Sequence, residues 1–330
     1  MIHDMRAAVL EEHGGDFNVT RVRKPTPQQG QVVVRIVASG VNPLDTKIRA
    51  GRADHARHPL PAILGMDLAG VVDAVGPGVN GFRVGDEVWG MTGGVGGLQG
   101  SLAEFAAVDA DLLALKPARL SMREAAATPL IFITAWEGLV DRADVRRGQT
   151  VLVQGGGGGV GHMAVQIAKA RGARVHATDR TDRAGFLAEL GASPIDRERA
   201  VEDYVAEHTD GKGFDVVYDT VGGSVLDASF RAVKRFGHVV SALGWGTHSL
   251  APLSFRAASY SGVFTLLPIL TGEGRARHGE ILREAARMAD AGMLMPRLDD
   301  RRYSLGDVAD AHAAIENRTA NGKLVVDIAD

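Results

Sequence analysis

The sequence predicts an α/β protein that combines a β-rich antiparallel domain with a doubly wound parallel sheet. Three observations support this class. The chain has 330 residues, enough for two hydrophobic cores. Residues 1–127 are rich in Val, Gly and Pro, whereas residues 128–265 alternate apolar strands with amphipathic helices. Residues 266–330 are too few to fold alone, so we expect them to return to the first domain.

Short apolar runs separated by turn residues fill the first domain. The runs with the clearest strand pattern are Gln31–Ala38, Leu68–Val75 and Asp86–Trp89. Glycine-rich turns such as Gly76-Pro77-Gly78 separate them. This spacing is typical of an antiparallel β domain.

Strands and helices alternate along the second domain, which predicts a parallel sheet covered on both faces. Strands are expected at Thr150–Gln154, Arg174–Thr178, near Ile195, Asp215–Asp219 and His238–Leu243. Helices are expected at Val160–Arg171, Asp182–Leu190, Val201–His208 and Val225–Arg235. The last segment is expected to add helices Gly279–Ala291 and Leu305–Asn317 and a strand at Lys323–Ile328.

Composition excludes several kinds of site. The chain contains no cysteine, which excludes disulfides, thiolate nucleophiles and cysteine-ligated zinc. The net charge is -3 and no basic stretch is present, so we expect no nucleic acid as partner. The apolar run Val263–Leu270 is too short to span a membrane, and the N-terminal residues lack a signal-peptide pattern. We therefore expect a cytoplasmic protein.

The strongest local motif is a run of glycines after the first strand of the second domain. Gly156, Gly158 and Gly161 satisfy the G-x-G-x-x-G pattern, and the turn also includes Gly155, Gly159 and Val160. Glycine there permits a tight turn, close approach of the backbone to a pyrophosphate, and close packing of helix on strand. The N-terminus of the following helix favours phosphate groups. The motif predicts a dinucleotide cofactor.

The residues after the second strand bear on the choice of cofactor. Asp179 lies where an acidic residue accepts the ribose 2′-OH of NAD. Arg180 follows it, with Arg183 and Arg197 nearby, and a guanidinium could instead hold the 2′-phosphate of NADP. The sequence leaves NAD(H) and NADP(H) equally open.

Five segments in one order carry a family resemblance: GVNPLDTKIRAG, LGMDLAG, VGDEV, FDVVYDTVG and GKLVV, which begin at Gly40, Leu64, Val84, Phe214 and Gly322. With the glycine run, they make the chain resemble the zinc-independent quinone oxidoreductases, the zeta-crystallin-like branch of the medium-chain dehydrogenase/reductase superfamily. The resemblance implies a GroES-like catalytic domain, a Rossmann cofactor domain and a C-terminal return. It also implies a homodimer or homotetramer joined through an edge strand, here Gly262–Leu267.

The same resemblance implies that no zinc is bound. Zinc alcohol dehydrogenases carry histidine where this chain has Met66, and their cysteine ligands are absent. We expect no metal.

The resemblance also implies catalytic residues. Asn42 matches a family asparagine near the nicotinamide, and its amide could donate to a carbonyl oxygen; the alternative is an Asn-Pro turn residue. Lys47 stands where several relatives have an active-site tyrosine, so it could donate a proton, contact a cofactor phosphate or point to solvent. Further cofactor contacts are expected, or else ordinary turn and core residues, at Thr134, Val221, Leu243, Gly244 and Lys323.

The sequence thus predicts metal-free hydride transfer from NAD(P)H to a small-molecule quinone or α,β-unsaturated carbonyl. Two alternatives remain open. One is alcohol/ketone interconversion, as in the wider superfamily, although an unassisted alkoxide forms poorly at neutral pH. The other is a non-enzymatic nucleotide- or RNA-binding protein, against which the net charge argues.

Overall fold

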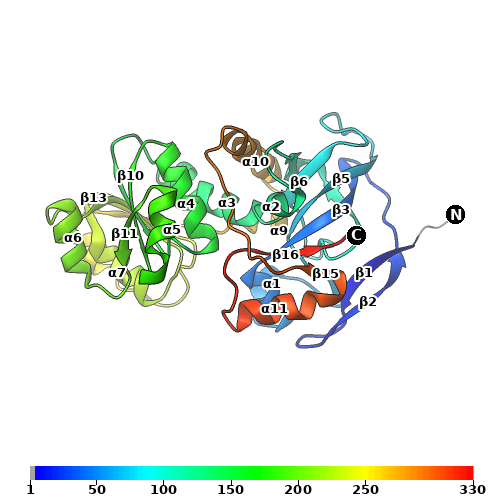
Figure 1. Ribbon diagram of the computed structural model, residues 1–330, viewed down its shortest axis with the longest axis horizontal. Coiled ribbons are helices and arrows are strands. Elements are labelled where there is room, and N and C mark those ends of the chain that lie inside the picture. The colour runs from blue at the N-terminus through cyan, green and yellow to red at the C-terminus, as the bar shows by residue number, and fades with distance from the viewer. Residues whose placement is uncertain (1–3, 330) are drawn as a thin grey trace. The chain divides into compact units, whose positions relative to one another are not determined.

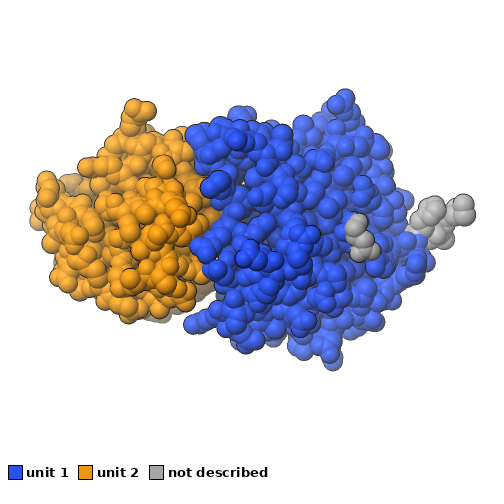
Figure 2. All heavy atoms as spheres, viewed as in Figure 1, with its two compact units in different colours: residues 1–130, 266–330 blue, residues 131–265 orange. Residues whose placement is uncertain are grey.

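The computed structural model describes residues 4–329, which form two compact units (Figures 1 and 2). One unit joins the residues up to Leu130 with the segment that begins at Leu266, and the other spans Ile131–Thr265. Residues 1–3 and 330, which the expected domain bounds include, lie outside the described residues. The chain leaves the first unit once and later returns to it.

Two sheets form the β-rich unit. The larger has the order β15-β16-β3-β5-β6-β8, with β7 also paired to β3, and the smaller has the order β2-β1-β4. All pairs are antiparallel except β15 with β16. The strands are β1 (Asp4–Leu10), β2 (Phe17–Arg23), β3 (Gln31–Val41), β4 (Ala62–Ile63), β5 (Asp67–Val75), β6 (Glu87–Met91), β7 (Phe105–Asp109), β8 (Leu113–Leu115), β15 (Tyr303–Ser304) and β16 (Leu324–Asp327).

Helices from the N-terminal and the C-terminal segments of the chain both belong to this unit. The two helices α1 and α11 contact each other although they lie far apart in sequence (Figure 1). The helices are α1 (Pro43–Arg49), α2 (Met122–Ala126), α9 (Leu267–Thr271), α10 (Arg275–Asp290) and α11 (Val308–Glu316), with 3-10 turns η1 (Asp54–Ala56), η2 (Ala110–Leu112) and η5 (Leu305–Asp307).

A six-stranded parallel sheet forms the second unit. Its order is β11-β10-β9-β12-β13-β14, which is that of a doubly wound Rossmann sheet. The strands are β9 (Thr150–Gln154), β10 (Arg174–Asp179), β11 (Ser193–Asp196), β12 (Phe214–Asp219), β13 (Val233–Ser241) and β14 (Ser259–Gly262). The α/β class predicted from the sequence is confirmed.

The chain moves outward from β9 in two directions, so right-handed crossovers place the early and late helices on opposite faces of the sheet. Helices α4 and α5 pack together, as do α6 and α7. The helical elements are α3 (Pro129–Trp136), η3 (Glu137–Arg142), α4 (Gly159–Ala170), η4 (Thr181–Arg183), α5 (Ala184–Leu190), α6 (Val201–Thr209), α7 (Ser224–Ala232) and α8 (Ala251–Ser254). The apolar faces of α6 and α7 meet the sheet in a core that includes Leu152, Tyr204, Phe214, Leu226, Phe230 and Val239.

Two expected elements are wrong. The edge strand is Ser259–Gly262 rather than Gly262–Leu267, because α9 begins at Leu267 with Pro268 in its first turn, and the true strand is polar and largely exposed. The helix expected at Val225–Arg235 ends at Ala232, and β13 begins at Val233 rather than at His238. Phe236 has a φ of 60°, and this irregular start of the strand hid it from the apolar pattern. Among the described residues, no helix combines the length and the apolar character needed to cross a membrane.

Candidate active site and cofactor cradle

The glycine run forms the turn between β9 and α4. The amides of Gly155 and Gly156 both donate to the main-chain oxygen of Thr178, at 3.1 and 2.9 Å. Gly158 is the N-cap of α4, and its amide donates to Gly155 at 3.0 Å. The amides of Gly159, Val160 and Gly161 belong to the first turn of this 12-residue helix, where a helix offers no internal acceptor. These amides are therefore placed to bind an anion.

Side chains are excluded from this turn by close packing. Gly155 has a φ of 75°, which favours glycine. A Cβ at Gly161 would lie 2.0 Å from the main-chain oxygen of Gly155, and a Cβ at Gly156 would lie 2.6 Å from Cβ of Ala177. The turn is thus a cradle built from backbone alone, in the manner that close approach of a pyrophosphate requires.

Asp179 and Arg183 hold the middle of the glycine turn. Oδ2 of Asp179 accepts the amide of Gly157 at 2.7 Å, and Oδ1 accepts the amide of Arg180 at 2.8 Å. Arg183 Nη1 donates to the oxygen of Gly157 at 2.5 Å. The structure therefore brings the expected acidic residue to the glycine turn.

The other two arginines near the turn are paired with carboxylates. The exposed Arg180 forms two bonds with Asp182, at 3.1 and 2.9 Å. Arg197 donates to Glu198 at 2.9 Å. Since both pairs are exposed, they are weak and could exchange for a phosphate.

The expected contacts at the carboxyl ends of β12 and β13 lie on adjacent turns. Val221 follows β12 with its side chain 47% exposed. Leu243 is half-buried and Gly244 is exposed after β13. Thr134 lies in α3, where its main-chain oxygen accepts the hydroxyl of Tyr218 at 2.7 Å. Ligands of doubly wound sheets bind at this edge.

Asn42 and Lys323 meet in the interior of the β-rich unit. Lys323 Nζ donates to the oxygen of Val41 at 2.8 Å and to Oδ1 of Asn42. Nδ2 of Asn42 donates to Oδ2 of Asp67 at 2.9 Å, and the other oxygen of Asp67 accepts the amide of Leu130 at 2.9 Å. Both ends of the Asn42 amide are thus fixed by buried charged partners.

Asp45 completes this buried polar cluster. Its Oδ2 accepts the amide of Asn42 at 2.8 Å, which fixes the first turn of α1, while Oδ1 has no hydrogen-bond partner among residues 4–329. Burial raises the pKa of Asp45 to about 7 and the pKa of Asp67 to about 6. Burial also lowers the pKa of Lys323, against the attraction of both carboxylates. The cluster contains one buried cation and two carboxyls.

The structure separates Lys47 from this cluster. Lys47 lies on the exposed face of α1, whereas Asn42, the N-cap of the same helix, is buried. Its side chain is therefore accessible to a ligand, and its catalytic role stays a prediction.

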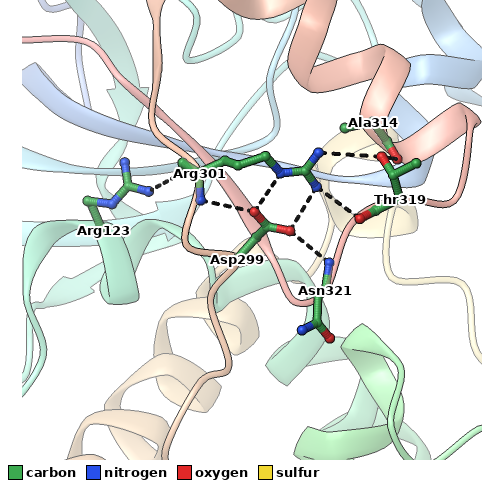
Figure 3. Close-up of polar contacts among 6 residues, drawn as sticks. All are labelled: Arg123, Asp299, Arg301, Ala314, Thr319 and Asn321. Atoms are coloured by element: carbon green, nitrogen blue, oxygen red, sulfur yellow. Dashed lines mark hydrogen bonds and ion pairs between the residues drawn. The ribbon is translucent and has the colours of Figure 1, made fainter. Parts of the chain in front are cut away.

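A second polar cluster holds the chain just before Lys323 (Figure 3). Arg301 binds Asp299 through Nε and Nη2, both at 2.8 Å, and also donates to the oxygen of Thr319 at 3.1 Å. Oδ2 of Asp299, which binds Nη2 of Arg301, also accepts the amide of Asn321 at 2.7 Å. Arg301 holds the pKa of Asp299 well below its usual range. This cluster fixes the turn from which Lys323 enters the interior.

Metal ligands are not gathered in the described part of the chain. No group of three or more His, Asp or Glu side chains between residues 4 and 329 is arranged to hold a metal ion. Met66, at the position where zinc enzymes carry histidine, is fully buried.

The sequence did not identify three buried acids as site residues: Asp67 and Asp299 of these two clusters, and Asp219 at the end of β12. Each stands beside a strand or turn motif, so its sequence context resembles that of an ordinary turn residue. For Asp67, the available signal was an acid flanked on both sides by apolar residues in the segment LGMDLAG.

Comparison with known families gives two matches. The model described as alcohol dehydrogenase GroES-like domain matches residues 28–118, and the model described as zinc-binding dehydrogenase matches residues 190–326.

Three relatives are similar to this chain over most of its length. The 2-methylene-furan-3-one reductase of Solanum lycopersicum is 36% identical over 316 residues, covering 93% of this chain and 74% of that protein. The chloroplastic NADPH-dependent alkenal/one oxidoreductase of Arabidopsis thaliana is 34% identical over 336 residues, covering 98% and 79%. The quinone oxidoreductase of Homo sapiens is 30% identical over 331 residues, covering 98% and 97%.

A solved structure is closer still. The crystal structure of an alcohol dehydrogenase superfamily protein from Novosphingobium aromaticivorans shares 63% identity with a TM-score of 0.97, covering 98% of this chain and 100% of that chain. The resemblance drawn from the sequence motifs is confirmed. The chain belongs to the quinone and enone oxidoreductase branch of the medium-chain dehydrogenase/reductase superfamily and is an oxidoreductase.

Proposed function

We propose that this chain catalyses the NAD(P)H-dependent reduction of a quinone or an α,β-unsaturated carbonyl. A bound nicotinamide supplies a hydride, that is, two electrons and a hydrogen nucleus. In an enone, the hydride adds to the β-carbon, the electrons of the double bond move toward the carbonyl oxygen, and a proton completes the α-carbon. In a quinone, hydride and proton together give the hydroquinone.

The observation that carries this proposal is the glycine cradle at the end of β9. A Cβ at Gly155 or Gly156 would collide with Val221 or Ala177, so the turn carries no side chains there, and the first-turn amides of α4 are placed to donate to a pyrophosphate. The fit therefore supports a dinucleotide, with Gly155–Gly161 on the pyrophosphate, Asp179 or Arg180 and Arg197 near the adenosine ribose, and Thr134, Val221, Leu243 and Gly244 toward the nicotinamide.

The chain's own residues orient and polarise the acceptor. The amide of Asn42 carries two hydrogens, one of which binds Asp67, and the second is proposed to donate to the acceptor carbonyl. Lys323 fixes the opposite side of this amide, so its orientation is set in advance. Lys47, accessible on α1, is proposed as the proton donor.

We propose that no metal takes part. The donor set supports this, because the sequence holds no cysteine and Met66 replaces a family histidine. Metal analysis of the purified protein tests the point directly. Stoichiometric zinc together with chelator-sensitive turnover would contradict it.

The acceptor class is tested by following the loss of reduced nicotinamide with ortho-quinones, para-quinones, enones and saturated ketones, each with NADH and NADPH. We expect reduced nicotinamide to be oxidised when a quinone or an enone is the acceptor. Coenzyme binding without turnover of any acceptor would contradict it, and oxidation of alcohols alone would favour the alcohol dehydrogenase alternative. A salt-dependent shift of RNA by the protein would instead favour nucleic-acid binding.

Assembly and location are proposed on the same basis. Strand β14 is an edge of the parallel sheet, with Tyr260 exposed on it, so a second copy could pair there to give a homodimer or homotetramer. Light scattering tests this state, and a monomer at micromolar concentration would contradict it. We propose a cytoplasmic location, to be tested by cell fractionation.

A further inference from the structure

Asp219 is a fully buried carboxylate at the carboxyl end of β12. Its Oδ1 accepts the amides of Val221 and Gly222, at 3.1 and 3.0 Å, and its Oδ2 lies 3.2 Å from the amide of Gly222. Oδ2 also accepts the hydroxyl of Ser241 at 2.7 Å. One side chain therefore contacts both the turn that follows β12 and the end of β13.

Ser241 extends this network to the next turn. Its hydroxyl oxygen accepts the amide of Leu243 at 3.0 Å, while the amide of Ala242 donates to the main-chain oxygen of Asp219 at 3.0 Å. The two turns also approach closely, because a Cβ at Gly222 would lie 2.6 Å from the main-chain oxygen of Leu243. Asp219 and Ser241 thus fix the spacing between the turn at Val221 and the turn at Leu243.

Backbone pairing also joins the two strands, separately from this network. Strands β12 and β13 are already held by their parallel register from Val216 with His238 to Asp219 with Ser241. Burying a carboxylate is costly unless hydrogen bonds compensate for it. Among the described residues, the carboxylate of Asp219 accepts hydrogen bonds from the turn beyond β12 and from Ser241, which holds the turn beyond β13.

We propose that Asp219 is a positioning residue for the coenzyme: through Ser241 and the amides of Val221 and Gly222, it holds the two turns at the spacing that the nicotinamide half requires. This inference rests on the proposed function, because the turns matter only if a dinucleotide lies at this edge of the sheet. Asp219 touches neither reactant. It acts by fixing Val221, whose exposed side chain is placed to meet the ring.

The same strand offers a matched control. Asp215, near the amino end of β12, also accepts several bonds, from the amide and hydroxyl of Thr150, both at 2.7 Å, and from Lys234. It lies at the edge of the sheet opposite to the proposed coenzyme site. Removing it perturbs the same strand without touching either turn.

The experiment compares the wild-type chain with Asp219→Ala, Asp219→Asn, Ser241→Ala and the control Asp215→Ala. Coenzyme affinity is measured by calorimetry, and KM for coenzyme, KM for acceptor and kcat are measured with the best quinone or enone. Thermal unfolding gives the stability of each variant. The decisive result is whether KM for the coenzyme changes while KM for the acceptor does not, because a general loss of stability would not affect the coenzyme alone.

Asp219→Ala is expected to raise KM and Kd for the coenzyme by about tenfold or more, since it leaves the amides of Val221 and Gly222 and the hydroxyl of Ser241 without this acceptor. Asp219→Asn keeps an acceptor oxygen and should recover part of this loss. Ser241→Ala should shift the same parameters by a few-fold, and in the double variant the two effects should not add. Asp215→Ala should lower thermal stability while coenzyme KM stays within about twofold.

Two results would contradict the role of Asp219 and leave the proposed function intact. One is wild-type KM and Kd for the coenzyme in both Asp219→Ala and Ser241→Ala. The other is a loss of coenzyme affinity in Asp215→Ala equal to that in Asp219→Ala. If Asp219→Ala does not fold, Ser241→Ala decides by the same readout. A wild-type chain that binds neither NADH nor NADPH would overturn the proposed function, and this inference with it.

Discussion

Lys323 donates a hydrogen bond to the side-chain oxygen of Asn42, although 281 positions separate the two residues. Strand β16 makes this contact possible, because it pairs with the end of β3 so that Leu324 faces Val41. The ammonium thereby enters the interior beside the carboxyls of Asp45 and Asp67. Among the described residues of this cluster, Lys323 is the cation that both carboxyls share, so the stability of the unit depends on it.

Lys323→Met is expected to lower the free energy of unfolding by about 3 kcal/mol or more, because it leaves buried carboxyls without their cation. Urea titration measures the loss. Lys47→Met, an exposed change in the same unit, serves as the control and should stay within about 0.5 kcal/mol of the wild type. A loss below about 1 kcal/mol in Lys323→Met would show that the carboxyls do not depend on this cation.

Asp45 should make stability fall as pH rises. Its pKa is raised from 3.8 to about 7, so the folded state holds a proton that the unfolded state has released. The contribution is complete below about pH 4 and is lost as pH rises toward and through 7. Asp45→Asn cannot titrate and should flatten this part of the curve. Unfolding free energies in urea across this range test it, and equal slopes in both proteins would contradict the assignment.

Much of the fold could be predicted from the sequence, because its signals are local. The strand Thr150–Gln154 was expected within its observed bounds, and the glycine run placed the first helix of the parallel sheet correctly to within a residue. The edge strand was wrong since an exposed edge needs no apolar pattern. The order and register of the strands depend on tertiary packing, which cannot be read from local patterns in a single sequence.

The polar clusters were less accessible to prediction. The motifs supplied Asn42 and Lys323 as separate candidates, but only the pairing of β16 with β3 brings them together. Asp67 and Asp219 gain their roles from partners on other strands. Such contacts depend on register between distant segments, and no local spacing reports them.

Gly161→Ala should weaken coenzyme binding by about tenfold or more, because the added Cβ would lie 2.0 Å from the oxygen of Gly155 and must distort the cradle. Gly185→Ala in α5 is the matched control. Its Cβ would meet no atom within 4 Å, so this change should leave binding intact and stabilise the helix by about 0.4–1 kcal/mol. Calorimetry with NADH and NADPH measures both. Unchanged binding in Gly161→Ala would exclude the cradle as the pyrophosphate site.

Asp179 should oppose the 2′-phosphate of NADPH, because its carboxylate lies at the end of β10 and is held in place by the amides of Gly157 and Arg180. Asp179→Asn removes the charge but keeps an acceptor for one of these bonds. We expect it to raise the ratio of kcat/KM for NADPH over NADH by about tenfold, equal to about 1.4 kcal/mol. Glu189→Gln on α5 removes the same charge from an exposed position and should leave the ratio unchanged. If both variants shift the ratio equally, the effect comes from net charge. If Asp179→Asn does not shift it, the adenosine ribose lies away from β10, and the coenzyme is bound in a different register along the sheet edge.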